Sequence, residues 1–434
     1  MQLRGLAQAP STFAGAEDTS MPSDPKARRL LVALCLIEFL ERLAGCFVAS
    51  SLVLYLNESR HLSTSQATRI CGWVFGLSYA AAVGGGILLD RYLGARLATL
   101  LGLGALCVSF CGVQVSPPVP LWSIAGLFVV GNGLFKPGIV ALLNRTLPLG
   151  HVDRAAGFYW FYVAVNVGGL CAPLLGSTAQ VQFGWAGASM LTAILVACGA
   201  SVLLSQWSAV SDAPAVIATH PKEPLRSQRP DGFSLMPLAA LVTYCALYAQ
   251  SMSTLMIWAR DCAARKVLGW AIPPTFFAAV PPAVVLIGTP LLPALMRALS
   301  SRSRKPTDQE KTEYGVVLAG AAYLPMLWVA LLGHQTDASP LWLVSCKVIL
   351  TAGEMLLLPS ALSALSGAAS PERSGFVLGL SFGAQAVGFW LGGLLGAKWG
   401  QWSQPTFFAV LTVLGLGTAA AMRAGTLLLR RSGR

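Results

Sequence analysis

Long apolar runs recur along the whole chain and limit its fold more than any other feature. Roughly twelve of them approach 20 residues, the length that a helix needs to cross the hydrocarbon core of a bilayer. Charged residues make up only 11% of the chain, against about 25% in soluble domains. The alternating segments of ~10 residues that a membrane β-barrel requires are absent. The sequence therefore predicts an all-α membrane protein.

The runs predict twelve transmembrane helices in two six-helix bundles, separated by one polar stretch. Weak 6+6 symmetry of this kind is typical of rocking transporters. We expect a disordered cytoplasmic segment, an amino-terminal bundle, a cytoplasmic linker, a carboxyl-terminal bundle and a cytoplasmic tail at 1–29, 30–206, 207–234, 235–428 and 429–434. The predicted spans are 30–56, 68–89, 96–115, 121–143, 156–178, 184–205, 235–258, 273–296, 314–333, 341–365, 374–396 and 404–428.

The distribution of Lys and Arg predicts the orientation. With the amino terminus inside, 21 of the 30 Lys and Arg residues fall in inside segments and six in outside segments. The other three lie within spans, namely Arg42, Lys136 and Lys347. Basic loops stay in the cytoplasm, so both termini are expected there, in a protein of the cell membrane. Because the net charge of +12 sits in short loops, it does not indicate a nucleic-acid partner.

One lysine lies near the middle of the fourth span. Lys136 is flanked by apolar residues over 121–143, and a charge at that depth costs about 3 kcal/mol on an insertion scale. Such a cation is kept when it faces the bundle interior and meets a partner. Glu354 in the tenth span is the expected partner, which predicts a salt bridge between the two bundles. Lys347, seven residues before Glu354, either faces the same interior or extends to the outer headgroups.

A second charged group lies on the first span. Glu38, Glu41 and Arg42 are three and four residues apart, which places them on one helical face. Arg42 can hold one carboxylate while the other remains free to take a proton. The three residues are therefore candidates for a proton-coupling cluster, or for a packed ion cluster that fixes the first helix.

The turn after the second span carries a Gly-xxx-Asp-Arg-xx-Gly-x-Arg pattern, made by Gly86, Asp90, Arg91, Gly94 and Arg96. It resembles the loop motif of the major facilitator superfamily. The resemblance implies a cytoplasmic gate whose role is conformational, without contact to the substrate.

Several further runs resemble the proton-dependent oligopeptide transporter (POT/PTR) family of that superfamily. They are Glu38-x-x-Glu41-Arg42, Gly131-Asn-Gly-Leu-Phe-Lys136-Pro137, the run 157–168, Gln250 with Ser253 and Thr254, and Gly353-Glu354 with Pro359. The resemblance implies a symporter that imports small peptides or peptide-like solutes with protons. It implies proton coupling at Glu38, Glu41, Arg42 and Glu354, and a salt bridge between Lys136 and Glu354. It also implies a substrate cavity lined by Tyr79, Lys136, Tyr162, Asn166, Gln250 and Glu354.

The chain departs from the family pattern where a peptide is commonly held. Small or apolar residues stand at the positions where aromatic, charged or amide residues are common, namely Gly45, Cys46, Ala49, Ala249, Val280 and Ser381. The loss of an Arg at Ala49 and of an acid at Ala249 is consistent with removal of a whole ion pair. We therefore expect a diverged peptide-binding site that favours a larger, neutral or capped solute.

Other functions remain open from the sequence alone. One alternative is a major facilitator transporter that takes up or expels a non-peptide small molecule, and another is a membrane scaffold or sensor. An enzyme is disfavoured because the sequence has no HExxH motif and no obvious base beside a serine. The ten cysteines are scattered and predict no metal site. We expect no cofactor besides protons, and a monomer in the lipid bilayer as the functional unit.

Overall fold

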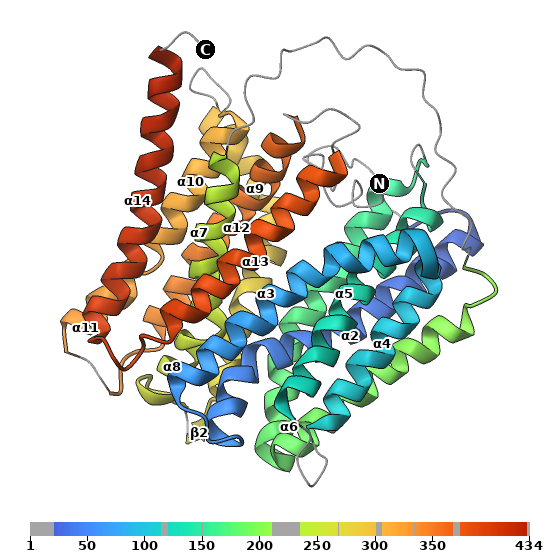
Figure 1. The fold of residues 1–434 in the computed structure, drawn as a ribbon, viewed down its shortest axis with the longest axis horizontal. Coiled ribbons are helices and arrows are strands. Elements are labelled where there is room, and N and C mark those ends of the chain that lie inside the picture. The colour runs from blue at the N-terminus through green and yellow to red at the C-terminus, as the bar shows by residue number, and fades with distance from the viewer. Residues whose placement is uncertain are drawn as a thin grey trace.

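The computed structural model describes residues 21–113, 120–148, 151–210, 235–267, 269–300, 306–333, 336–367 and 374–431, and these are almost entirely helical (Figure 1). The amino-terminal half contains α2 (Pro25–Glu58), α3 (Thr64–Leu88), a π-helical turn η2 (Leu89–Leu93), α4 (Gly94–Gly112), α5 (Leu121–Thr146) and α6 (Arg154–Ser205). The predicted linker 207–234 lies mostly outside the described residues.

The carboxyl-terminal half contains more interruptions. It holds α7 (Met236–Met252), α8 (Thr254–Asp261), a two-stranded antiparallel hairpin of β1 (Lys266–Val267) and β2 (Trp270–Ala271), the 3-10 helix η3 (Pro274–Ala279), α9 (Val280–Ser300), α10 (Asp308–Ala321), α11 (Leu324–Leu331), α12 (Leu341–Gly367), α13 (Ser374–Gly396) and α14 (Gln404–Arg431). The hairpin pairs Lys266 with Ala271.

The first helix begins earlier than predicted. Residues 25–29 were expected to be disordered, but α2 starts at Pro25. Asp24 caps it, since its carboxylate accepts hydrogen bonds from the backbone N–H groups of Lys26 and Ala27. A proline at the first helical position also favours a start there. Of the other residues in this predicted segment, 21–24 precede the helix and 1–20 lie outside the described residues.

Nine helical stretches of the described residues are long and apolar enough to cross a membrane. Two of them, Thr64–Gly112 and Arg154–Ser205, have 49 and 52 residues, enough for two crossings each at about 20 residues a crossing. The second breaks at Gly184, whose φ of 69° suits glycine. The helix α2 is not among the nine, and it carries Glu38, Glu41 and Arg42. Counted with α2 and with the long stretches as pairs, the described helices fit the twelve predicted spans.

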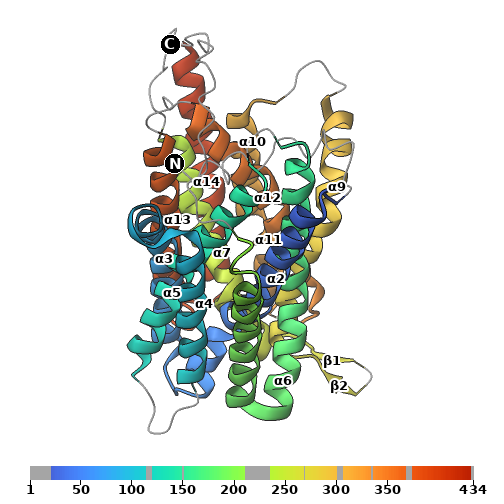
Figure 2. The same cartoon turned by 90° about the vertical axis from the view of Figure 1, so that its right-hand side faces the viewer.

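The helices form two bundles that meet along α3 and α13. In one bundle α2 packs on α6 and α4 on α5, and in the other α10 packs on α12 and α14. Figure 1 shows the bundles diverging toward the end where α2 begins and α14 ends, called here the terminal end. Figure 2 shows the β1–β2 hairpin at the opposite end, called here the hairpin end.

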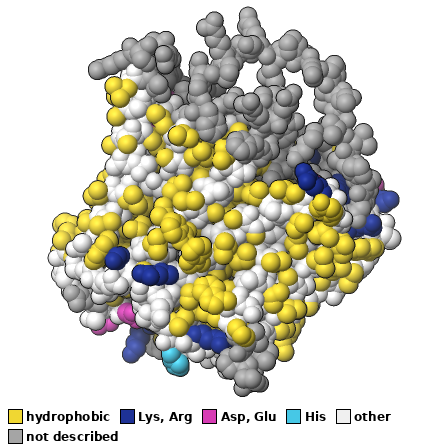
Figure 3. Space-filling view, viewed as in Figure 1, with side chains coloured by type: hydrophobic (Ala, Val, Ile, Leu, Met, Phe, Trp, Pro, Cys, Tyr) yellow, Lys and Arg dark blue, Asp and Glu magenta, His cyan; other side chains and the backbone are white. Residues whose placement is uncertain are grey.

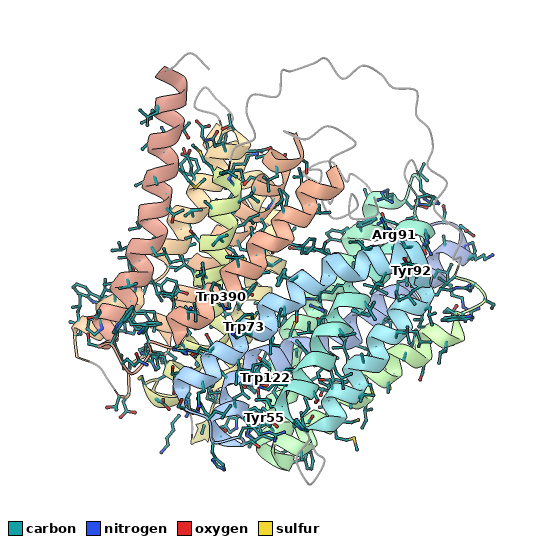
Figure 4. The ribbon with its side chains drawn as sticks, in the orientation of Figure 1. Tyr55, Trp73, Arg91, Tyr92, Trp122 and Trp390 are labelled. Carbon is teal, nitrogen blue, oxygen red and sulfur yellow. The ribbon has the colours of Figure 1, made fainter. Side chains whose placement is uncertain are left out.

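Glycines allow the close approach of α3 to α13. A Cβ atom on Gly72 would lie only 2.6 Å from Cα of Gly393, so the two backbones touch at this point. Trp73 and Trp390 lie beside the contact with ring centroids 5.9 Å apart (Figure 4). This crossing is the main connection between the bundles in the structure.

The bundles are closed at the hairpin end and separated at the terminal end. Arg260 Nη1 lies 3.6 Å from Glu58 Oε1 of the other bundle, and the hydroxyls of Ser177 and Thr275 form a buried hydrogen bond between the bundles. By contrast, α5 and α12 are not closely packed on one another within the described residues. The visible outer face is mainly hydrophobic, with its charged side chains toward the edges (Figure 3), as expected of a membrane protein.

Candidate functional site

The structure brings together the three charged residues of α2. Arg42 Nε lies 3.2 Å from Glu38 Oε1 and donates a hydrogen bond of 2.6 Å to Glu41 Oε2, which Arg42 Nη2 also contacts. Both carboxylates are buried, yet Glu38 Oε2 and Glu41 Oε1 have no hydrogen-bond partner among the described residues. A buried acceptor without a donor is costly, and a proton on either carboxylate would turn such an oxygen into a donor. The spacing correctly predicted the shared face, while proton coupling remains a prediction.

Lys136 lies on α5 beside this cluster. Its Nζ atom is 5.4 Å from the centroid of the Tyr79 ring on α3, a distance at which an ammonium is attracted to an aromatic face. The charges of Arg42, Glu41 and Glu38 are within electrostatic range of Lys136. Among the described residues, however, no carboxylate lies within the 4.0 Å of a salt bridge to Lys136.

Glu354 lies on α12, in the other bundle. Its carboxylate faces the hydroxyl of Tyr244 on α7, although that hydroxyl makes no hydrogen bond of good geometry. Tyr79, Tyr162 and Tyr248 are also within electrostatic range of Glu354. The predicted salt bridge to Lys136 is not formed in this conformation. The physical reason is the separation of the bundles at the terminal end, which keeps α5 away from α12.

Tyr79 lies between the two unpaired charges. Its ring stacks on Phe389 of α13 at 5.0 Å between centroids, which holds it at the crossing of the bundles. Lys136, Tyr79 and Glu354 lie deep among the helices but keep accessible surface. The predicted cavity between the bundles would thus have a cation on one side, on α5, and an anion on the other, on α12.

Two other predicted cavity residues lie on α6. The hydroxyl of Tyr162 interacts with Thr289 of α9 in the other bundle, so this residue lies at the seam. Asn166 is 9% exposed and donates to the backbone carbonyl of Tyr162. Both residues are thus engaged within the protein in this conformation, and contact of either with a solute remains a prediction.

The predicted cavity position of Gln250 needs correction. Its side chain is fully buried within the carboxyl-terminal bundle. Its Nε2 donates to the carbonyls of Ala246 and Gly392, and its Oε1 accepts from Thr254. All of its main hydrogen-bonding groups are thus engaged, and in this conformation Gln250 joins α7 to α13 without facing the cavity.

The predicted gate pattern lies at the terminal end, on the turn from α3 to α4. Gly94 has a φ of 70°, which glycine adopts without penalty, and Gly86 precedes the π-helical turn. Arg96 Nη1 donates to the carbonyl of Trp207 and its guanidinium lies 4.9 Å from that indole ring. Asp90 and Arg91 are exposed, and Figure 4 shows Arg91 at this end. A role as a latch remains a prediction.

Three of the departures from the family pattern lie in closely packed surroundings, on α2, α7 and α13. A Cβ on Gly45 would lie 2.9 Å from Glu41 Oε1, so glycine leaves room for that carboxylate. Ala249 is buried, and a Cβ added to Gly392 would lie only 2.5 Å from the Cβ of Ala249, so α7 and α13 approach closely at this point. Ser381 is fully buried and donates to Leu378 in its own helix. The cavity thus gains no charge from these positions.

Two tyrosines near Glu354 were not predicted from the sequence, and the position of one lysine was left open. Tyr244 and Tyr248 lie four residues apart on α7 and stack at 5.7 Å between centroids, a spacing that would have placed them on one face. Lys347 is 1% exposed and does not extend to the headgroups. None of the described residues forms a cluster suited to a metal ion.

The chain is similar to known peptide transporters along most of its length. The peptide transporter YePEPT of Yersinia enterocolitica is 26% identical over 90% of this chain and 92% of its own length. Dipeptide and tripeptide permease B of Edwardsiella piscicida is 26% identical over 82% of this chain and 84% of its own. The crystal structure of the peptide transporter POT in complex with sulfate has a TM-score of 0.83, with 21% identity over 93% of this chain and 95% of that one.

A structure of a POT family transporter with 5-aminolevulinic acid has a TM-score of 0.80, with 20% identity over 91% of this chain and 95% of that one. These likenesses show the major facilitator fold in the described residues. The model of the POT family matches residues 97–215 and 233–404, which is more than half of the sequence. The chain belongs to the POT family.

Proposed function

We propose that this protein is a symporter that imports small peptides or peptide-like zwitterions together with protons. The observation that carries the proposal is the pair of opposite charges on the two bundles, Lys136 and Glu354, which both lie within range of Tyr79. A solute carboxylate would pair with Lys136 and a solute ammonium with Glu354. Each new ion pair would offset part of the free energy that Lys136 or Glu354 loses by lying inside the membrane without full hydration.

The cluster on α2 supports the coupling to protons. Glu38 and Glu41 share one guanidinium and each keeps a buried oxygen without a donor. Protonation of one carboxylate would reduce the negative charge beside Lys136. That change would free Lys136 for a solute or for Glu354, and would thereby couple the proton to the position of the bundles.

The separated terminal end supports transport by alternating access. By the Lys and Arg distribution the terminal end is cytoplasmic, so this conformation would be open inward and closed outward at Glu58 and Arg260. One chain supplies both walls of the cavity, and the proposed functional unit is a monomer. No cofactor is required besides the proton.

The test is uptake of radiolabelled dialanine by proteoliposomes under an imposed pH gradient. Lys136→Ala is expected to lose gradient-driven uptake. Lys398→Ala, which removes an exposed lysine outside the cavity, is the matched control and should transport normally. Uptake by Lys136→Ala at the wild-type rate would exclude this lysine from the coupling and would remove the main support for the proposal.

A second candidate is a transporter of a non-peptide small molecule. It is favoured by Ala49 and Ala249, because neither supplies a charge to a peptide terminus. A thermal-shift screen against di- and tripeptides, amino acids and drug-like solutes separates the two. Stabilisation by solutes without a free carboxylate and amine, and not by peptides, would favour the second candidate.

A further inference from the structure

Lys347 is a second lysine inside the membrane-spanning part, and the transport scheme above does not use it. It lies on α12, two helical turns from Glu354, and its side chain is 1% exposed. Placing a lysine there costs several kcal/mol of lost hydration unless the ammonium finds partners. The groups that the ammonium of Lys347 contacts therefore show how this cost is offset.

The ammonium of Lys347 contacts two oxygen atoms of Ser251, which lies beside a break in the seventh span. Nζ donates to the carbonyl oxygen of Ser251 at 2.9 Å and to its hydroxyl at 2.7 Å. The helix α7 ends at Met252 and α8 begins at Thr254, because Ser253 has non-helical angles of φ −128° and ψ −89°. The last carbonyls of a helix lack intrahelical donors, and a cation is favoured at this negative end of the helix dipole.

No carboxylate compensates this lysine within the described residues. In the described part of the chain, the one titratable side chain in electrostatic range of Lys347 is Cys346, next to it on α12. Tyr323, between α10 and α11, faces Cys346 and donates its hydroxyl to the Leu247 carbonyl. The elements α7, α9 and α13 present no charged group to Lys347 among these residues.

The surroundings suit both protonation states of the amine. A charged ammonium donates to the carbonyl and to the hydroxyl of Ser251. A neutral amine keeps the bond to the carbonyl and accepts the hydroxyl proton of Ser251 on its lone pair. The charged form gains from the helix dipole, and the neutral form avoids the cost of a buried charge without an anion.

We propose that Lys347 is a proton-binding site in the carboxyl-terminal bundle, and that its proton stabilises the break between α7 and α8. The charged form caps α7 and fixes the direction of α8. At its far end α8 carries Arg260, which pairs with Glu58 across the hairpin end. Proton loss at Lys347 therefore loosens the segment that closes this end. This proposal is independent of the transported solute.

The thiol of Cys262 reports on the position of α8. Cys262 follows α8, is 5% exposed, and accepts a hydrogen bond from Gln404 Nε2 at 3.4 Å, near the start of α14. A swing of α8 about Ser253 would separate it from Gln404 and expose it. Burial raises the pKa of the Cys262 thiol, so variants must be compared at the same pH.

The experiment measures alkylation of Cys262 by N-ethylmaleimide in the full chain in lipid nanodiscs, read by mass spectrometry across roughly pH 5 to 9. Exposed Cys111 of the other bundle is the internal reference. Lys347→Met keeps the side-chain length without a titratable group, and Lys347→Arg keeps the charge at every pH. We expect Lys347→Met to react several-fold faster than wild type at acidic pH and at the wild-type rate at alkaline pH. Lys347→Arg should react slowly throughout.

The proposal is overturned if the ratio of the Lys347→Met rate to the wild-type rate is the same at every pH, or if Lys347→Arg reacts as fast as Lys347→Met. Should Lys347→Met fail to fold, Ser251→Ala provides the second test, since it keeps the lysine and removes a hydroxyl that accepts from the ammonium at 2.7 Å. A hydrogen bond from a charged donor is stronger than one between neutral groups, so the charged form loses more, and Cys262 alkylation should rise at lower pH than in wild type. An unchanged pH profile of Ser251→Ala would also overturn the proposal.

Discussion

The contact between α3 and α13 makes a sharp prediction for Gly72→Ala. The new Cβ would lie 2.6 Å from Cα of Gly393, 3.0 Å from its backbone nitrogen and 3.0 Å from the Phe389 carbonyl oxygen. All three neighbours are backbone atoms, so no side chain can rotate away. Ordinary contacts begin at 3.4 Å, and the helices must separate by roughly 0.8 Å. Overpacking of this kind costs about 1–3 kcal/mol.

The added methyl group destabilises the conformation that is closed at the hairpin end, because Gly72 lies in the half of α3 nearer that end. A penalty of about 1–3 kcal/mol changes the ratio of two conformations by roughly 5- to 150-fold. We therefore expect Gly72→Ala to slow gradient-driven dialanine uptake by a factor in this range and to lower the unfolding temperature.

Gly84→Ala is the matched control on the same helix. A Cβ there has no atom within 4 Å, and both substitutions carry the same gain of about 1 kcal/mol in helix propensity. Gly84→Ala should thus be as stable as wild type or more so, with unchanged uptake. Equal stability and equal uptake in the two variants would refute the idea that the bundles meet backbone to backbone at Gly72.

Three further substitutions test other parts of the site. Glu354→Gln fixes an uncharged side chain, so it should lose gradient-driven uptake but keep solute exchange at equal pH; retained accumulation would contradict a protonation role. Gln250→Ala removes the hydrogen bonds to Gly392 and Thr254 and should lower the free energy of unfolding by roughly 1–3 kcal/mol. Thermal unfolding measures this loss, and an unchanged midpoint would argue against the buried position of Gln250. Glu58→Gln breaks an exposed pair at 3.6 Å and should cost less than about 1 kcal/mol; a larger loss of stability would show that this pair carries the closure of the hairpin end.

The periodicity of the sequence predicted the features that depend on one helix. The shared face of Glu38, Glu41 and Arg42 follows from spacing alone and is present in the structure. The spans follow from apolar length, and the early start of α2 follows from Asp24 as a cap, a signal that the sequence analysis did not use. The break of the seventh span at Ser253 has no such signal.

Features that depend on two helices were harder to predict. A glutamine on a helix can face a cavity or a neighbouring helix, and periodicity does not distinguish these, which is why Gln250 was misplaced. The burial of Lys347 depends on the broken carbonyl end of α7, which lies far away in sequence. The pairing of Lys136 with Glu354 depends on the conformation of the whole molecule.

The separation of Lys136 from Glu354 is itself part of the argument for transport. Each charge bears a solvation cost in this conformation, and closure of the terminal end would bring α5 and α12 together and relieve it. A salt bridge that forms in one conformation and not in the other changes the free-energy difference between the two conformations. A solute or a proton shifts the equilibrium only by acting differently on the two conformations. A structure of this chain closed at the terminal end, without solute, should therefore show the two side chains within 4 Å, the limit for a salt bridge. If they remain apart there, the charges do not link the bundles, and the coupling must be sought at Glu38 and Glu41 alone.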